Sequence, residues 1–289
     1  MARWALIFNP TAGRFTPRTF DALQLELRRL GVTPLPMPTH HPGHATQLAA
    51  AVERVERVAV YGGDGTLNEV ANGLAGRDLP LVFLPGGTAN VMAHELGLPQ
   101  DPVRAAAALV HAEPRPVRPG RIGKRLFLLM AGLGFDGEAV SRVSVEWKAR
   151  IGKGAYVWAG LRTLLSRSPA LTVRTPGGTE RTAAWAVAAR AKRYGGRFAI
   201  HPRAGLEQPA LGLTLVRRWG LLPFVAGNLG LGLPWAAPGA SFGESTEIEV
   251  RAESPIHVQV DGDYLGSGTE FRIDLAEAAI PFCFPVSVR

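Results

Sequence analysis

Three short loops rich in glycine and small polar residues dominate the first hundred residues. They cover residues 9–13, 62–66 and 85–90, and each lies between an apolar run and a segment with helical periodicity. Glycine lets a backbone approach a ligand closely, and the N–H groups at the start of a helix bind anions. Because such loops lie together along the carboxyl edge of an open α/β sheet, they predict a phosphate-binding surface.

The second loop, Gly62-Gly63-Asp64-Gly65-Thr66, adds one carboxylate to the glycines. Phosphoryl transfer from a nucleotide needs a cation to offset phosphate charge, and Asp64 could hold Mg²⁺ directly or through water. The plain alternative is a strand–turn–helix corner with Thr66 as its cap. Short polar side chains that could bind phosphate oxygens or cap local structure also follow other strands: Asn9, Thr11, Thr39, Thr88 and Asn90.

Two further acids, Asp261 and Asp263, flank Gly262 at the end of an apolar run over 256–260. Asp-Gly is typical of a tight hairpin turn. Their spacing alone therefore indicates a turn and no chemistry.

Other patterns favour no site. Gly132, Gly134 and Gly137 match G-x-G-x-x-G, but residues 151–162 lack the acid that a dinucleotide site needs, so we expect a turn packed close to the domain interface. The spacing of His40, His41 and His44 matches no standard metal site. The chain contains no G-x-x-x-x-G-K-[ST] motif, which disfavours a P-loop NTPase.

The elements that must position these loops alternate between strand and helix. Strands are predicted over 3–8, 32–38, 57–61 and 81–84, and helices over 17–30, 43–54, 67–74, 92–96 and 101–112. This alternation predicts a doubly wound, mostly parallel α/β sheet.

After residue 115 the pattern changes to short β-type runs. They cover 117–122, 125–131, 170–175, 183–190, 212–217, 246–251, 256–260 and 270–274, with helices over 137–149 and 154–166. An antiparallel β domain is therefore expected after a boundary near residue 115.

The overall composition and net charge indicate which classes of partner to expect. The 289 residues suit two domains, and the formal net charge of +8 favours anionic partners. No Lys/Arg-dense block, zinc-finger spacing or RNP-type strand indicates nucleic acid, so arginines scattered over 142–218 favour an anionic membrane surface. One cysteine, Cys283, and no signal-like start lead us to expect a cytoplasmic protein that associates peripherally with membranes. The uncharged stretch 219–243 is rich in proline and glycine, which favours a buried or interfacial segment over a membrane span.

Together the motifs resemble the diacylglycerol kinase catalytic-domain family of bacterial lipid kinases, which is related to sphingosine and ceramide kinases. The resemblance spans nearly the whole chain, and residues 62–73 (GGDGTLNEVANG) carry its most specific part. Further matches are Asn9-Pro10-x-Ala12-Gly13, Leu84-Pro85-x-Gly87-Thr88-x-Asn90, Gly132-x-Gly134-Phe135-Asp136 and Asp261-Gly262.

The resemblance implies a nucleotide-binding α/β domain, residues 1–115 with a return over 276–289, and a β-sandwich lipid-substrate domain over 116–275. It implies transfer of the γ-phosphoryl group of ATP to a lipid hydroxyl, with Mg²⁺ held by Asp64. It places ATP at Asn9, Pro10, Thr11, Ala12, Gly13, Thr39, Gly62, Gly63, Asp64, Gly65, Thr66, Leu67, Asn68, Glu69, Gly87, Thr88 and Asn90. It also implies Asp261 as general base with Asp263 as its neighbour, or the reverse order, and leaves a homodimer open.

Three departures from the family pattern keep alternatives open. Val91 replaces an acid, Asp263 replaces a glutamate, and residues 207–211 (EQPAL) replace the D-D-G-x-L segment of a second Mg²⁺ site, which we predict to be empty. A kinase of a soluble acceptor on the same fold and a catalytically weak nucleotide- or lipid-binding protein are the two alternatives.

Overall fold

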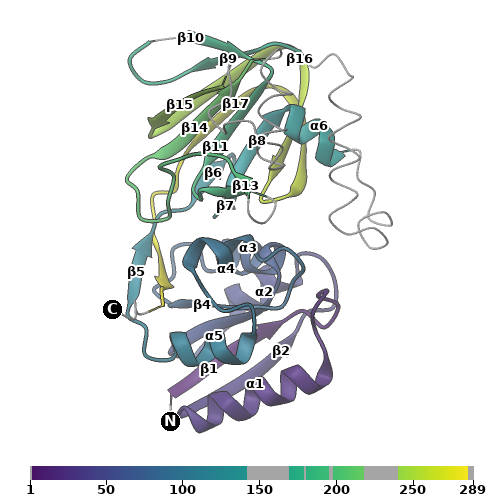
Figure 1. Ribbon diagram of the computed structural model, residues 1–289, viewed down its shortest axis with the longest axis vertical. Coiled ribbons are helices and arrows are strands. Elements are labelled where there is room, and N and C mark those ends of the chain that lie inside the picture. Colours follow the sequence, from purple (N-terminus) through teal and green to yellow (C-terminus); the bar gives the residue numbers. More distant parts are fainter. Residues whose placement is uncertain (1, 142–168, 179, 195–197, 218–239, 286–289) are drawn as a thin grey trace. The chain divides into compact units, whose positions relative to one another are not determined.

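The computed structural model describes residues 2–141, 169–178, 180–194, 198–217 and 240–285 (Figure 1). The chain forms two compact units. The α/β unit comprises Met1–Arg118 and Glu277–Arg289, and the β unit comprises Pro119–Ala276.

Strands and helices alternate through the α/β unit. Its strands are β1 (Ala2–Phe8), β2 (Val32–Pro38), β3 (Arg57–Gly62), β4 (Leu81–Pro85), β5 (Pro114–Val117) and β18 (Ile280–Cys283). Its helices are α1 (Pro17–Arg29), α2 (His44–Ala51), α3 (Asp64–Gly73), α4 (Val91–Leu96) and α5 (Pro102–Leu109).

The sheet of the α/β unit has the order β2-β1-β3-β4-β18-β5. Its first five strands run parallel, and β5 is antiparallel to β18. The central strands β3 and β4 are almost continuously buried, as expected for a parallel sheet covered on both faces. The register pairs Phe8 with Tyr61 and Gly62 with Pro85, so β1, β3 and β4 end at one edge.

Helix α1 illustrates how local sequence sets these elements. Thr16 caps the helix by accepting a hydrogen bond from the amide of Thr19, and Pro17 occupies the first turn, where its missing N–H costs nothing. Leu23 and Leu27, one helical turn apart, are fully buried. The helix stops before Gly31, whose φ of +84° suits glycine.

The β unit is antiparallel. Its elements are β6 (Gly120–Ile122), β7 (Arg125–Phe127), β8 (Met130–Gly134), α6 (Phe135–Ser141), β9 (Leu171–Arg174), β10 (Glu180–Ala183), β11 (Trp185–Ala189), β12 (Arg193–Tyr194), β13 (Phe198–Ala199), β14 (Leu211–Val216), β15 (Ala240–Ser245), β16 (Glu247–Val260) and β17 (Asp263–Leu275). Hydrogen bonds join most strands in the order β15-β14-β11-β8-β16-β17-β6-β7, and β12 pairs only with β13 among the described residues.

The long strand β16 organises the β unit. It pairs with β17 along one edge, and on its other edge with β9 at residues 249–252 and with β8 at residues 258–260. An irregularity in the β16–β17 pairing separates these two stretches, and such bulges bend a strand. Residues from both halves share one hydrophobic core, including Leu133, Leu171 and Ile273.

The predicted fold class, an α/β domain followed by an antiparallel β domain, is confirmed. Several predicted boundaries are wrong. Helix α3 begins at Asp64 and not at residue 67, because Gly63 takes the N-cap position. The runs 246–251 and 256–260 form one strand, since pairing with β17 continues past the bulge.

The predicted run 125–131 is divided at Leu128 and Leu129, whose amides bond to the Asp261 side chain instead of a neighbouring strand. The predicted run 117–122 likewise separates into β5 and β6. The predicted helix 154–166 and most of the uncharged stretch 219–243 lie outside the described residues.

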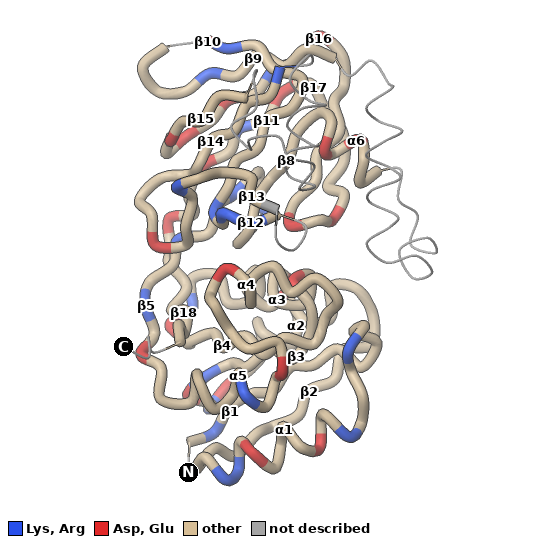
Figure 2. Tube along the Cα trace, viewed as in Figure 1, with Lys and Arg blue, Asp and Glu red and all other residues tan. Residues whose placement is uncertain are grey.

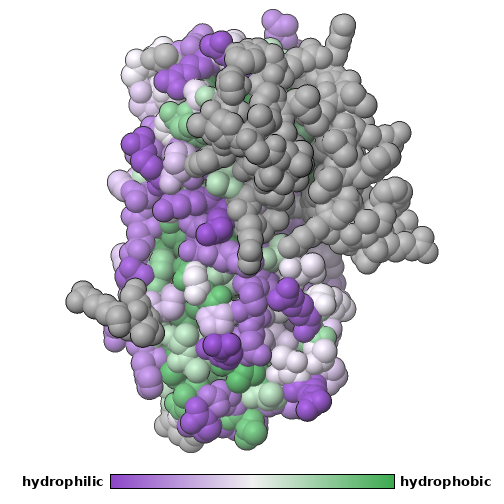
Figure 3. Space-filling view, in the orientation of Figure 1, coloured by the Kyte–Doolittle hydropathy of each residue, from purple (hydrophilic) through white to green (hydrophobic). Residues whose placement is uncertain are grey.

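Basic and acidic residues are interspersed along both units (Figure 2). Hydrophobic and hydrophilic residues are also mixed on the face of the α/β unit that Figure 3 shows. Large hydrophobic residues are exposed at only three described positions, Leu25, Tyr264 and Leu265. Among the described residues, no helix has the length and apolar character needed to cross a membrane.

Candidate active site

The three glycine-rich loops lie side by side at one edge of the α/β sheet. Backbone hydrogen bonds join them. The amide of Asn9 donates to the carbonyl of Tyr61 (3.1 Å), and the amide of Arg14 donates to the carbonyl of Gly86 (2.9 Å). The amide of Gly86 donates to the carbonyl of Gly62 (2.7 Å). This arrangement agrees with the expectation from the sequence. Thr39 reaches the same edge, because its amide bonds to the end of β1.

Close backbone packing explains why glycine occupies these loops. A Cβ on Gly87 would lie 2.5 Å from the Cα of Gly63, so the second and third loops touch main chain to main chain. A Cβ on Gly13 would lie 2.5 Å from Oγ1 of Thr88, which brings the first loop against the third. The sheet edge therefore presents mainly backbone, as a phosphate-binding surface requires.

The start of α3 supplies the amide donors. Gly63 is the N-cap, and no side chain caps the helix. The first amides of a helix have no intrahelical acceptor, so those of Asp64, Gly65 and Thr66 are suited to an anion. Thr66 is buried in the first turn, so the alternative in which it caps this helix is wrong.

Asp64 binds backbone as well. Its two carboxylate oxygens accept hydrogen bonds from the amides of Val91 and Met92, each at 2.9 Å, and so cap α4 from outside that helix. Burial raises the pKa of Asp64 above its ordinary value, while the bonds from Met92 and Val91 act in the opposite direction.

These contacts decide how Asp64 fits a metal. No cluster of three His, Cys, Asp or Glu side chains suited to a metal occurs among the described residues. Mg²⁺ in nucleotide sites is usually held by one or two carboxylates plus substrate phosphates and waters. The carboxylate oxygens of Asp64, which accept the Val91 and Met92 amides, retain lone pairs for such a cation or its water.

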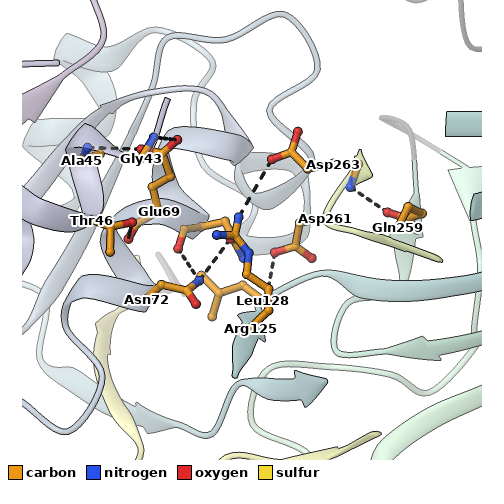
Figure 4. A network of polar contacts seen from close by, with 12 residues as sticks. Gly43, Ala45, Thr46, Glu69, Asn72, Arg125, Leu128, Gln259, Asp261 and Asp263 are labelled. Carbon is orange, nitrogen blue, oxygen red and sulfur yellow. Dashed lines mark hydrogen bonds and ion pairs between the residues drawn. The ribbon is translucent and has the colours of Figure 1, made fainter. Parts of the chain in front are cut away.

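Glu69 does not point toward the loops. Its carboxylate accepts hydrogen bonds from the amides of Gly43 (2.9 Å) and Ala45 (3.1 Å), at the N-terminus of α2 (Figure 4). Leu67 and Asn68 are each only 1% exposed. The side chains of these three predicted ATP-binding residues therefore hold the α/β unit together.

Asn90 likewise stabilises its own loop. It is fully buried with φ of +47°, and its Oδ1 accepts a hydrogen bond from the amide of Gly87 (2.9 Å). Its Nδ2 donates to Gln100 (3.0 Å), so the side chain caps no helix. In the first loop, Asn9 Oδ1 accepts hydrogen bonds from the amide and hydroxyl of Thr11 (2.9 and 2.8 Å). Thr11 and Thr88 are the exposed hydroxyls of the edge.

In the β unit, Asp261 and Gly262 form a two-residue turn between β16 and β17. Their φ angles of +49° and +89°, with Val260 paired to Asp263, are those of a tight hairpin turn. The carboxylate of Asp261 accepts hydrogen bonds from three consecutive amides, those of Leu128 and Leu129 (both 2.9 Å) and Met130 (2.8 Å). Asp261 therefore anchors this turn to the segment between β7 and β8 (Figure 4).

Asp263 has different surroundings. Half of its side-chain surface is exposed, and its Oδ2 lies 4.0 Å from Nη2 of Arg125 on β7 (Figure 4). Sequence reasoning missed Arg125, because nothing in the spacing of β7 indicates which acid it faces.

Two other patterns are explained by packing. In the G-x-G-x-x-G match, Gly134 has φ of +82°, and a Cβ on Gly137 would lie 2.1 Å from the carbonyl of His257, so α6 packs closely on β16. His40 donates its amide to Nδ1 of His44, and both the His40 and His41 rings stack on His44.

A positively charged side chain of the protein binds the segment that aligns with the family's second Mg²⁺ site, residues 207–211. The buried Arg190 guanidinium donates to the carbonyl oxygens of Gln208 (2.8 Å), Ala210 (3.1 Å) and Leu206. Its positive charge therefore occupies the centre of this loop.

Comparison with known proteins agrees with this geometry. Residues 3–122 match the family model described as "Diacylglycerol kinase catalytic domain". The matched residues include all three glycine-rich loops of the α/β unit. The resemblance inferred from the motifs is thus confirmed.

Among curated relatives, "Diacylglycerol kinase" of Bacillus subtilis (strain 168) is 35% identical over 176 residues, which are 58% of this chain and 58% of the relative. "Probable lipid kinase YegS-like" of Pseudomonas putida is 38% identical over 127 residues, 43% of either chain. Each match spans less than two thirds of the relative. A solved structure described as a putative diacylglycerol kinase from Bacillus anthracis str. Sterne aligns with a TM-score of 0.83 at 22% identity, over 99% of this chain and 96% of that one. At this identity it supports the fold of both units.

Proposed function

We propose that this chain is an ATP-dependent kinase that phosphorylates a lipid hydroxyl. One observation supports the proposal most directly: backbone contacts join the three loops around the start of α3, where no side chain caps the helix. Such a surface suits a triphosphate, and the family supplies the reaction class. The proposed nucleotide contacts are the amides of residues 63–66, the hydroxyls of Thr11 and Thr88, and Thr39, whereas the amides of Gly86 and Gly87 already donate within the loops.

The α/β unit would bind and orient ATP. Amide donors at a helix start stabilise phosphate charge and cost no reorganisation during transfer. Mg²⁺, when bound, offsets phosphate charge, and Asp64 is the carboxylate that would hold it through water. Because Glu69 and Asn90 fix α2 and the third loop, we assign them to positioning and not to contact with ATP.

The β unit would supply the general base. In the proposed step the lipid hydroxyl oxygen bonds to the γ-phosphorus, the bond from that phosphorus to the β-phosphate oxygen breaks, and ADP leaves. The hydroxyl proton passes to a carboxylate, which must lie within hydrogen-bond reach. We assign this role to Asp263 and not to Asp261. Three amides already use the carboxylate of Asp261, whereas that of Asp263 is half exposed.

The net charge of the chain bears on the acceptor and on the cellular site. The net charge of +8 suits an anionic membrane surface, where a lipid substrate is presented. We propose a peripheral, cytoplasmic enzyme on this basis and on the family.

An acceptor panel tests the proposal. The purified full chain is incubated with γ-labelled ATP, Mg²⁺ and mixed micelles of diacylglycerol, a sphingoid base or ceramide, and separately with soluble alcohols such as NAD. Mg²⁺-dependent labelling of a lipid is expected. Labelling of the soluble alcohols alone would establish the alternative of a soluble-acceptor kinase. ATP binding without transfer to any acceptor would establish a nucleotide-binding protein.

A further inference from the structure

A buried chain of hydrogen bonds runs from α6 to the turn that precedes Asp263. Asp136, in the first turn of α6, is 2% exposed. The hydroxyl of Tyr194 donates to its Oδ1 (2.5 Å), and Nε2 of Gln259 donates to its Oδ2 (2.6 Å). Oε1 of the fully buried Gln259 then accepts a hydrogen bond from the amide of Gly262 (2.8 Å). Figure 4 shows this last contact.

The surrounding backbone leaves room for these contacts. A Cβ on Gly132 would lie 2.0 Å from Oδ2 of Asp136 and 2.7 Å from Nε2 of Gln259. Glycine at this position therefore keeps open the space in which the carboxylate and the amide meet. The turn is thus held on two sides, by Gln259 at Gly262 and by the amides that bind Asp261.

The polarity of the chain is fixed at both ends. The Gly262 amide can only donate, so Gln259 must present its oxygen there and its NH₂ group to Asp136. An ionised carboxylate accepts that donor. A neutral group at Asp136 that presents a donor would oppose the NH₂ group, and a flipped Gln259 would leave the Gly262 amide without its acceptor. The state of Asp136 is therefore coupled to the turn.

We propose that Asp136 and Gln259 are positioning residues that hold the Asp261-Gly262 turn, and with it Asp263, in its reactive position. The inference rests on the proposed function for the catalytic consequence alone. The hydrogen-bond chain itself can be tested without any substrate.

The electrostatics of the site support this coupling. Burial raises the pKa of Asp136 to about 6, and the hydrogen bonds from Tyr194 and Gln259 oppose the rise. Helix α6 packs against β8, β16 and β17. Strand β8 carries no ionisable side chain. Close in sequence to the residues of the hydrogen-bond chain and its turn, the other elements carry Glu138 on α6, Arg193 on β12, His257 on β16, and Asp263 and Tyr264 on β17. None of these five groups contributes to the shift in the pKa of Asp136, and Tyr194 is the one ionisable group that does.

A polarity swap tests the proposal. Asp136→Asn keeps the shape but offers one acceptor in place of two. With its oxygen toward Tyr194 it places NH₂ against the NH₂ group of Gln259, and with its oxygen toward Gln259 it no longer accepts from the Tyr194 hydroxyl. The double variant Asp136→Asn with Gln259→Glu restores complementarity, since Asn donates to the new carboxylate, which also accepts from Gly262. Hydrogen exchange of peptides that contain residue 262 is measured by mass spectrometry, and kcat and KM for ATP are measured as functions of pH. Glu253→Gln, on the exposed part of β16, is the matched control.

Loss of one buried hydrogen bond corresponds to roughly tenfold in an equilibrium. We expect Asp136→Asn to show exchange about tenfold faster and kcat about tenfold lower, with KM for ATP unchanged. The double variant should return within about threefold of wild type. Wild-type kcat should fall as the pH drops through about 6, and Asp136→Asn should lack that fall.

Unchanged exchange in Asp136→Asn, or a double variant no better than the single one, would overturn the proposal. If Asp136→Asn does not fold, Gln259→Met removes both bonds at similar volume and should accelerate exchange equally; normal exchange in it would overturn the proposal too. A wild type that phosphorylates no acceptor refutes the proposed function, and exchange alone then decides whether Asp136 fixes the turn.

Discussion

Replacing Asp261 by Asn should destabilise the β unit, whereas replacing Asp263 by Asn should spare stability and remove turnover. The two acids are separated by one glycine, so sequence position does not distinguish them. Their contacts do. Asp261 accepts three amide hydrogen bonds, and Asp263 faces Arg125 at 4.0 Å with half its surface exposed.

The magnitude follows from the three bonds. Oδ1 of Asp261 accepts from Leu129 and Met130, and Oδ2 accepts from Leu128. Asn can keep the first two as weaker, neutral bonds, but its NH₂ group would face the Leu128 amide. Losing one charge-assisted bond costs about 2 kcal/mol, and weakening two more adds about 1 kcal/mol. The sum of about 3 kcal/mol corresponds to a fall in Tm of roughly 6–12 °C. For Asp263→Asn, loss of an exposed ion pair costs about 0–1 kcal/mol.

Thermal unfolding of the full chain and initial rates at saturating ATP provide the assay. For Asp263→Asn we expect a Tm within about 4 °C of wild type and kcat lower by about 100-fold or more, the size of a general-base contribution. The assignment would be refuted if Asp263→Asn kept full turnover while Asp261→Asn lost it at unchanged Tm. That result would return the base to Asp261.

Three further results are expected. Glu69→Ala should lower the free energy of unfolding by about 1–2 kcal/mol in urea titrations, because two amides at the start of α2 lose their acceptor, while Glu69→Gln should cost less. Gly87→Ala should weaken ATP binding by about tenfold or more in calorimetry, since its Cβ would overlap Gly63, whereas Gly243→Ala, with open space around it, should bind normally. Burial lowers the pKa of His201 below 6.5, so its contribution to stability is present above pH 6.5 and is lost as the pH falls through its folded value; acid unfolding of His201→Gln should lack this contribution.

Periodicity predicted most of the α/β unit. Alternating apolar runs and helical segments gave β1, β2, β3 and β4 in their observed places, and the loops between them fell on one sheet edge as expected. The β unit was harder to predict. Strands β16 and β17 pair on both sides of a bulge next to Pro255, so each continues as one long strand. This pairing depends on the partner strand, and the local sequence pattern does not predict it.

For the acidic residues of the candidate site, the sequence does not predict which groups their carboxylates bind. From sequence, Asp64, Glu69 and Asp261 are suited to metal, ATP and proton transfer. In the structure each accepts hydrogen bonds from amides at least 24 residues away, at α4, at α2 and at the segment before β8. A motif gives residue types and spacing, but the partner of a carboxylate depends on tertiary contacts that the motif does not contain.

These anchors also constrain how the site can evolve. An acid that caps a distant helix and also serves a cation, as proposed for Asp64, cannot be replaced without loss of both roles. The side chain of Asp263 is half exposed, so a side chain of different length can extend into solvent there at little cost to folding. Asp263, which stands where the family pattern has a glutamate, is therefore expected to leave the stability of the fold nearly unchanged. Its consequence should lie in the distance of proton transfer, and Asp263→Glu, which extends the carboxylate by one methylene, should change kcat at constant Tm.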